Sequence, residues 1–116
     1  MMTKVIYYSS LSGQNPIGKF LDSLSARQQA KILKIIENIK RYGLNSVLPH
    51  LKKLSGTPLW EIRVLGQDNI RVIYAVLYLD AVLILHGFIK KSQKTPEKEI
   101  DVALVRFNEY KKDVDK

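Results

Sequence analysis

Three lysines crowd into the five residues from Lys90 to Lys94. The apolar segment at residues 82–85 before them predicts a strand, and Thr95-Pro96 after them predicts the N-cap and first turn of a helix. Like charges this close repel one another, and the crowding becomes favourable when an anion such as a phosphate lies between them. The run therefore predicts an anion-binding loop between a strand and a helix, with a plain solvated linker as the alternative.

Two arginines occupy the strands that should lie beside this loop. From Leu59 the apolar residues alternate with Glu61 and Arg63, which predicts a strand with one apolar and one charged face. A turn at residues 66–69 leads to a second strand that carries Arg71 near its start. A third strand over 81–89 completes an antiparallel meander, because tight turns join all three.

The flanking segments predict helices around this meander. Residues 5–8 read as an opening strand. Asn15-Pro16 then starts a short helix, and Ser25 with Gln28 forms a capping box for a longer one that stops at Tyr42-Gly43. The segment 44–58 reads as an irregular connection, and residues 96–111 form a last amphipathic helix. The order β-α-α-β-β-β-α predicts one α+β domain over residues 1–116, with an N-terminal helical hairpin and a C-terminal helix packed on the sheet.

The amino-acid composition limits the kinds of catalytic and metal sites that the chain can form. The 116 residues include no cysteine and two histidines, which excludes thiolate catalysis and cysteine-ligated zinc. No metal-ligand spacing occurs, so neither a metal nor another cofactor is expected. The formal net charge of +8 favours an anionic partner. No signal peptide or membrane-spanning segment is evident, which predicts a cytoplasmic protein with no membrane partner.

Two stretches carry a resemblance to a known family. They are Leu59-Trp60-Glu61-Ile62-Arg63 followed by Ile70-Arg71-Val72-Ile73-Tyr74, and Leu85-His86-Gly87-Phe88-Ile89-Lys90-Lys91-Ser92-Gln93-Lys94-Thr95-Pro96. The chain resembles toxins of the RelE/ParE superfamily, and most closely the HigB-like branch related to phage Gp49-type proteins. The resemblance implies a RelE-like fold and a type II toxin that a helix-turn-helix, HigA-like antitoxin neutralises. Operator DNA would be bound only through the complex with that antitoxin.

The same resemblance implies an activity and a set of site residues. Most such toxins are ribosome-dependent endonucleases that cut messenger RNA. The reaction needs no metal, since the 2′-hydroxyl of the RNA is the nucleophile. Arg63 and Arg71 would grip phosphates or stabilise the transition state. Lys91 and Lys90 would occupy the basic position after the last strand, and Lys94 would extend the RNA-binding patch.

Several assignments have alternatives. Glu61 is expected at the RNA site, either as a general base or as a partner that holds Arg63 in place. Tyr74 would stack on an RNA base or pack in the core. His86 is expected to be a core or edge histidine bonded to the backbone, and His50 a surface residue. The alternative functions are a ParE-like inhibitor of DNA gyrase and a non-catalytic basic nucleic-acid-binding protein.

Overall fold

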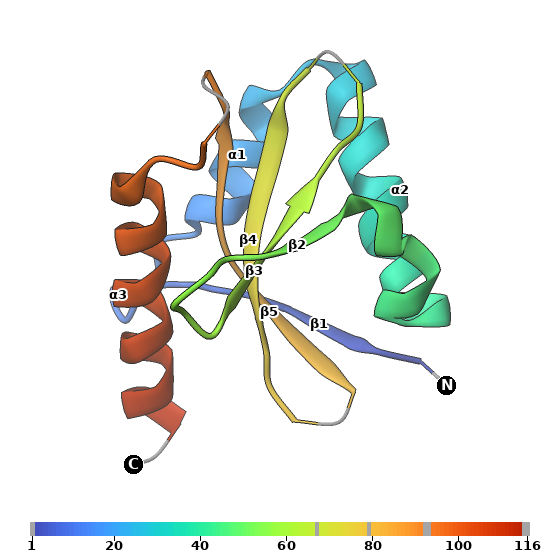
Figure 1. Cartoon of the computed structure of the whole chain (residues 1–116). Coiled ribbons are helices and arrows are strands. Elements are labelled where there is room, and N and C mark those ends of the chain that lie inside the picture. The colour runs from blue at the N-terminus through green and yellow to red at the C-terminus, as the bar shows by residue number, and fades with distance from the viewer. Residues whose placement is uncertain (1, 67, 79, 92–93, 115–116) are drawn as a thin grey trace.

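A five-stranded mixed sheet with the order β1-β5-β4-β3-β2 organises the computed structural model (Figure 1). The structure describes residues 2–66, 68–78, 80–91 and 94–114. The strands are β1 (Lys4–Tyr7), β2 (Leu51–Lys53), β3 (Leu59–Arg63), β4 (Ile70–Val76) and β5 (Ala81–Ile89). The predicted meander of β3, β4 and β5 is confirmed, with antiparallel pairing at both junctions. The expected antiparallel sheet is mixed, however, because β1 runs parallel to β5.

The first two helices begin where their capping residues predict. The helices are α1 (Pro16–Ser23), α2 (Ala26–Tyr42), the 3₁₀-helix η1 (Leu44–His50) and α3 (Glu97–Val114). The side chain of Asn15 accepts a hydrogen bond from the amide of Gly18, and Ser25 forms the predicted capping box with Gln28. Gly43 ends α2 with a φ of +84°, a backbone conformation that favours glycine. None of the helices within the described ranges is long and apolar enough to cross a bilayer.

Two hydrophobic cores lie on opposite faces of the sheet. Isoleucines of α2 and Ile17 of α1 pack against one face, and Ala103 and Phe107 of α3 pack against the other. Figure 1 shows the sheet between α2 and α3. The central strand β4 is buried on both faces from Ile70 to Ala75, as its apolar run predicts. Figure 1 shows that α3 covers only part of its face of the sheet.

The expectation of an irregular connection over 44–58 is wrong. The segment contains η1 and then β2, which pairs antiparallel with β3 and adds a fifth strand to the sheet. The turn between β2 and β3 contains Gly56 at a φ of +77°. The prediction missed this hairpin because β2 is only three residues long and contributes a single residue, Leu51, to the core beneath α2.

The predicted N-cap of the last helix is also wrong. Helix α3 begins at Glu97, and the carbonyl of Pro96 accepts the first helical hydrogen bond, from the amide of Ile100 at 3.3 Å. Pro96 therefore stands at the cap position. The hydroxyl of Thr95 donates instead to a carboxylate oxygen of Glu61 in β3, at 2.8 Å. A side chain expected to stabilise its own helix thus connects that helix to a distant strand.

Candidate functional site

Three cations, two from strands and one that directly follows a strand, meet at one end of the sheet. Arg63 ends β3 and is the direct cross-strand partner of Arg71 in β4. Arg71 in turn pairs with Phe88, two residues before Lys90, and the amide of Lys90 donates to the carbonyl of Asn69 at 2.8 Å. In Figure 1 these segments lie at the upper end of the sheet. We call Arg63, Arg71 and Lys90 the cationic cluster.

Two members of the cationic cluster are withdrawn from water. Arg71 is 7% exposed and Lys90 is 4% exposed. Burial lowers the pKa of Lys90, and the nearby charges of Arg71, Arg63 and Lys52 lower it further, whereas Glu61 raises it. Burial also lowers the pKa of Arg71, although a guanidinium keeps its proton at physiological pH. Cations held together in this way are stabilised by an anion placed among them.

Glu61 provides the negative charge beneath the cluster. Its side chain is fully buried, with Oε1 3.6 Å from Nε of Arg71 and Oε2 accepting the hydrogen bond from Thr95. The ion pair predicted with Arg63 is formed with Arg71 instead. The burial of Glu61 contradicts the expectation that this residue contacts RNA. The alternating pattern of β3 predicts a solvated charged face, but Glu61 on that face is buried and hydrogen-bonded to Thr95.

Among the described residues, one nitrogen of each arginine in the cluster lacks a hydrogen-bond acceptor. Within the described part of the chain, Nε of Arg63, Nε of Arg71 and Oε1 of Glu61 are buried without a hydrogen-bond partner. Nη1 of Arg71 donates only to the carbonyl of the preceding residue, at 3.1 Å. Buried unsatisfied polar atoms are rare in folded proteins and call for a local explanation such as a ligand or a functional role.

The two outer lysines flank this cluster. Lys91 follows Lys90 and Lys94 precedes Thr95, and both side chains are exposed. Ser92 and Gln93 of the predicted anion-binding loop lie outside the described residues. Both described ends of the loop therefore adjoin the cluster, one through Lys90 and the other through the hydrogen bond from Thr95 to Glu61.

Tyr74 does not belong to the site. It is 1% exposed and packs in the core beneath α1 and α2, on the face of the sheet opposite to Ile73. Burial raises the pKa of its hydroxyl. The prediction that its ring contacts RNA is therefore contradicted, because neither ring face is open for stacking. Its alternative assignment as a core residue is confirmed.

His86 links β5 to α3 through side chains rather than through the backbone. Its Nδ1 accepts a hydrogen bond from Nη1 of Arg106 at 3.2 Å, so its proton lies on Nε2, which is 2.9 Å from a carboxylate oxygen of Glu99. Its ring also stacks on Phe88 at a centroid distance of 5.6 Å. The predicted structural role holds, but the bonding partners differ from those expected.

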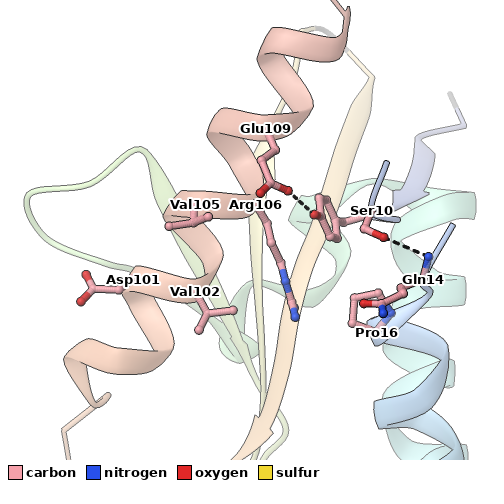
Figure 2. Close-up of a pocket in the computed structure, with 9 residues that line it drawn as sticks. Ser10, Gln14, Pro16, Asp101, Val102, Val105, Arg106 and Glu109 are labelled. Carbon is pink, nitrogen blue, oxygen red and sulfur yellow. Dashed lines mark hydrogen bonds between the residues drawn. The ribbon is translucent and has the colours of Figure 1, made fainter. Parts of the chain in front are cut away.

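A groove beside α3 is separate from the cationic cluster. It has a volume of about 450 Å³ and lies between α3 and the chain that follows β1. Figure 2 shows Arg106 and Glu109 of α3 on one side and Ser10, Gln14 and Pro16 on the other. The hydroxyl of Tyr8 donates to Glu109, and the guanidinium of Arg106 lies 5.4 Å from the Tyr8 ring. The groove is lined by both basic and acidic side chains, so it does not form an anion-binding site.

Lys52 and Thr95 are residues that the sequence-based assignment missed. Lys52 is exposed on β2, directly opposite Glu61, and its charge acts on Lys90. The sequence did contain a signal for the hairpin that carries Lys52. The turn-forming Ser-Gly-Thr-Pro stretch at residues 55–58 separates two short segments that can pair as strands. For Thr95 no local signal existed, because its partner is 34 residues away.

The amino-acid sequence of the whole chain was also compared with those of known proteins. No curated protein sequence matches the chain significantly. The model of the family described as "Phage derived protein Gp49-like (DUF891)" matches residues 19–108. This range contains the cationic cluster, Glu61, Lys52 and Thr95. The chain therefore belongs to the Gp49-like family, a RelE/HigB-like family of toxins from toxin–antitoxin systems.

Proposed function

We propose that this protein is a metal-independent endoribonuclease toxin that cleaves messenger RNA on the ribosome. The observation that carries the proposal is the meeting of Arg63 of β3, Arg71 of β4 and Lys90, which follows β5, at one end of the sheet. Membership of a toxin family supports it. A phosphate held between these cations would satisfy their charge and give the arginine donors an acceptor.

The proposed reaction uses a nucleophile that the RNA itself supplies. The 2′-oxygen attacks the adjacent phosphorus and loses its proton, while the bond from phosphorus to the 5′-oxygen breaks and that oxygen takes up a proton. The products are a 2′,3′-cyclic phosphate and a free 5′-hydroxyl. Negative charge grows on the non-bridging oxygens as phosphorus becomes pentacoordinate, so fixed cations accelerate the step.

Each cation has a proposed role in this step. Arg63 and Arg71 bind the non-bridging oxygens, because a guanidinium donates two parallel hydrogen bonds. Lys90 is buried next to these arginines and carries the lowered pKa, which suits it to stabilise the leaving oxygen or to donate its proton. The exposed side chains of Lys91, Lys94 and Lys52 bind neighbouring phosphates and hold the strand in place. No cofactor takes part.

The proposed partners follow from the same assignment. The ribosome and its messenger RNA are the target, which places the action in the cytoplasm. A HigA-like antitoxin with a helix-turn-helix domain neutralises the toxin, and operator DNA is bound only by their complex. A net charge of +8 favours an antitoxin with an acidic contact surface.

The decisive experiment expresses the protein from an inducible promoter without an antitoxin. We expect growth arrest and new 5′ ends within codons of ribosome-bound messages. Arg71→Ala and Arg63→Ala should each reduce cleavage roughly 100- to 1,000-fold. Arg41→Ala is the matched control, because Arg41 lies on α2 and pairs there with exposed Glu37.

Two other outcomes would overturn the nuclease proposal. Intact messages together with DNA-damage signalling would indicate a gyrase inhibitor. RNA binding that weakens in proportion to the phosphate contacts removed, without any cleavage, would indicate a non-catalytic binding protein.

A further inference from the structure

We propose that Glu61 is a positioning residue that orients Arg71 within the cationic cluster, and that the Thr95 hydroxyl holds its carboxylate in place. The proposal rests on the nuclease function proposed above and adds a residue that does not touch the RNA. Oε1 of Glu61 lies 3.6 Å from Nε of Arg71, and Oε2 accepts the hydrogen bond from Thr95 at 2.8 Å.

The burial of Glu61 argues for a specific role. A fully buried carboxylate is costly unless charges and hydrogen bonds compensate it. Within the described residues, Oε1 makes no hydrogen bond, so the compensation on that side comes from charge rather than from a close bidentate pair. A carboxylate at this distance attracts the guanidinium of Arg71 without occupying its donors. The arginine is thereby oriented while its hydrogen-bonding capacity is kept for a phosphate.

Glu61 is unsuited to act as the general base itself. A base must come within hydrogen-bond reach of the proton that it removes. Glu61 has no exposed surface, and Thr95 donates to the oxygen that does not face Arg71. Its effect on the reaction therefore passes through the cations that it faces.

Thr95 extends the same arrangement to the loop. It follows Lys94 in the chain and comes shortly before α3, which starts at Glu97. Its buried hydroxyl donates a hydrogen bond to Glu61 of β3. This bond joins the carboxylate of Glu61 to the end of the lysine loop. Loss of this hydroxyl should loosen both.

The proposal predicts opposite effects on RNA binding and on turnover. Glu61→Gln keeps the shape of the side chain and raises the formal net charge by one from +8. RNA affinity should therefore stay the same or increase. Turnover should fall on the order of 10- to 100-fold, because misplaced catalytic groups lose rate through geometry. A purely structural role would weaken both together.

The experiment compares Glu61→Gln, Thr95→Val and Thr95→Ser with the wild-type protein. Glu97→Gln is the matched control, since it removes one negative charge from an exposed position near the start of α3. The readouts are kcat and KM on programmed ribosomes, and affinity for an RNA whose 2′-hydroxyls are replaced by hydrogen. A third readout is the titration of Lys90, followed by NMR of its side chain. Thermal unfolding confirms that each variant is folded.

We expect Glu61→Gln to lower kcat with KM and affinity preserved, and to lower the pKa of Lys90. Thr95→Val should lower kcat by less, and Thr95→Ser should restore it. If Glu61→Gln unfolds, the two Thr95 variants carry the test. An unchanged kcat for Glu61→Gln, or a loss shared equally by Glu97→Gln, would overturn the proposal. If the wild-type protein cleaves no RNA, the nuclease function fails, whereas the titration of Lys90 still shows whether the carboxylate of Glu61 acts on the cationic cluster.

Discussion

Arg63 and Arg71 are direct cross-strand partners on β3 and β4, on the same face of the sheet. Like charges at directly opposed positions of an antiparallel pair destabilise a sheet. The buried carboxylate of Glu61 offsets this repulsion on the side of Arg71, at 3.6 Å. Two opposed guanidiniums reduce the stability of the free protein and are most useful when an anion is bound between them.

The two arginines should differ in their effect on stability. Arg63→Gln should leave the free energy of unfolding unchanged or raise it by up to about 1 kcal/mol, because it removes one of two opposed charges. Arg71→Gln should lower it by several kcal/mol, on the order of 3, because it leaves buried Glu61 without its ion pair. Urea unfolding of both variants measures the difference. Equal destabilisation by the two substitutions would contradict the assignment of Arg71 as the partner of Glu61.

Lys90 should make nucleic-acid binding sensitive to alkaline pH. Its pKa is lowered from 10.5, chiefly by burial, so it loses its positive charge at a lower pH than an exposed lysine. Affinity for a short oligonucleotide that lacks 2′-hydroxyls should therefore fall as pH rises toward that lowered pKa. Lys90→Arg should abolish this decrease, because arginine stays protonated. Lys34→Arg, at an exposed position of α2, is the control and should keep the wild-type profile.

Asp68 should make the stability of the fold depend on pH. It accepts hydrogen bonds from Lys31 at 2.8 Å and Arg27 at 3.1 Å, which ties the β3–β4 turn to α2. The hydrogen bond from Lys31 contributes most to lowering its pKa from 3.8. A carboxyl group with a lowered pKa stabilises the fold above its unfolded-state pKa, and this contribution is lost as pH falls through the folded-state value.

Asp68→Asn should therefore be less stable than the wild type at pH 7, and the two proteins should converge in strong acid. Urea unfolding at both pH values makes the comparison. Glu37→Gln, which breaks a fully surface pair with Arg41, is the control and should have a smaller effect at pH 7. A difference for Asp68→Asn that persists unchanged in acid would refute the ionic explanation.

Gly87 allows α1 to pack closely on β5. A Cβ atom at this position would overlap the ring of Phe20. Gly87→Ala should therefore reduce stability by about 1–3 kcal/mol, as overpacked cores do. Combining it with Phe20→Leu should recover part of the loss, which a double-mutant cycle of thermal unfolding measures. If the stability changes of the two substitutions are strictly additive, the close contact between Gly87 and Phe20 does not limit the packing of α1 on β5.

Local patterns were sufficient to predict most of the elements around the site, with β2 as the exception. Asn15, the Ser25–Gln28 capping box and Gly43 mark helix ends through bonds to residues only a few positions away. The meander could also be predicted from the sequence, because short turns separate its three strands and the apolar residues of β3 alternate with charged ones. Tyr74 could have been excluded from the site by the same reasoning. It is three residues from Arg71, and an odd spacing along a strand places two side chains on opposite faces.

The polar interior of the site could not be predicted in this way. In the sequence, Glu61 alternates with apolar neighbours as a solvated residue would. It is buried and accepts a hydrogen bond from Thr95, 34 residues away, and no local pattern contains that information. The pairing of Glu61 with Arg71 rather than Arg63 likewise depends on side-chain geometry across two strands. The sequence therefore predicted Arg63, Arg71 and Lys90 as site residues. The position of the Glu61 carboxylate that faces Arg71 required the three-dimensional structure.

The parallel pairing of β1 with β5 joins the first strand of the chain to the last. The sheet therefore cannot be completed during synthesis until β5 has been made, and the cationic cluster is completed only when Lys90 follows it. A partly synthesised chain that stops before Lys90 has both arginines but lacks the third cation. The complete cationic cluster therefore forms only late in the synthesis of this chain.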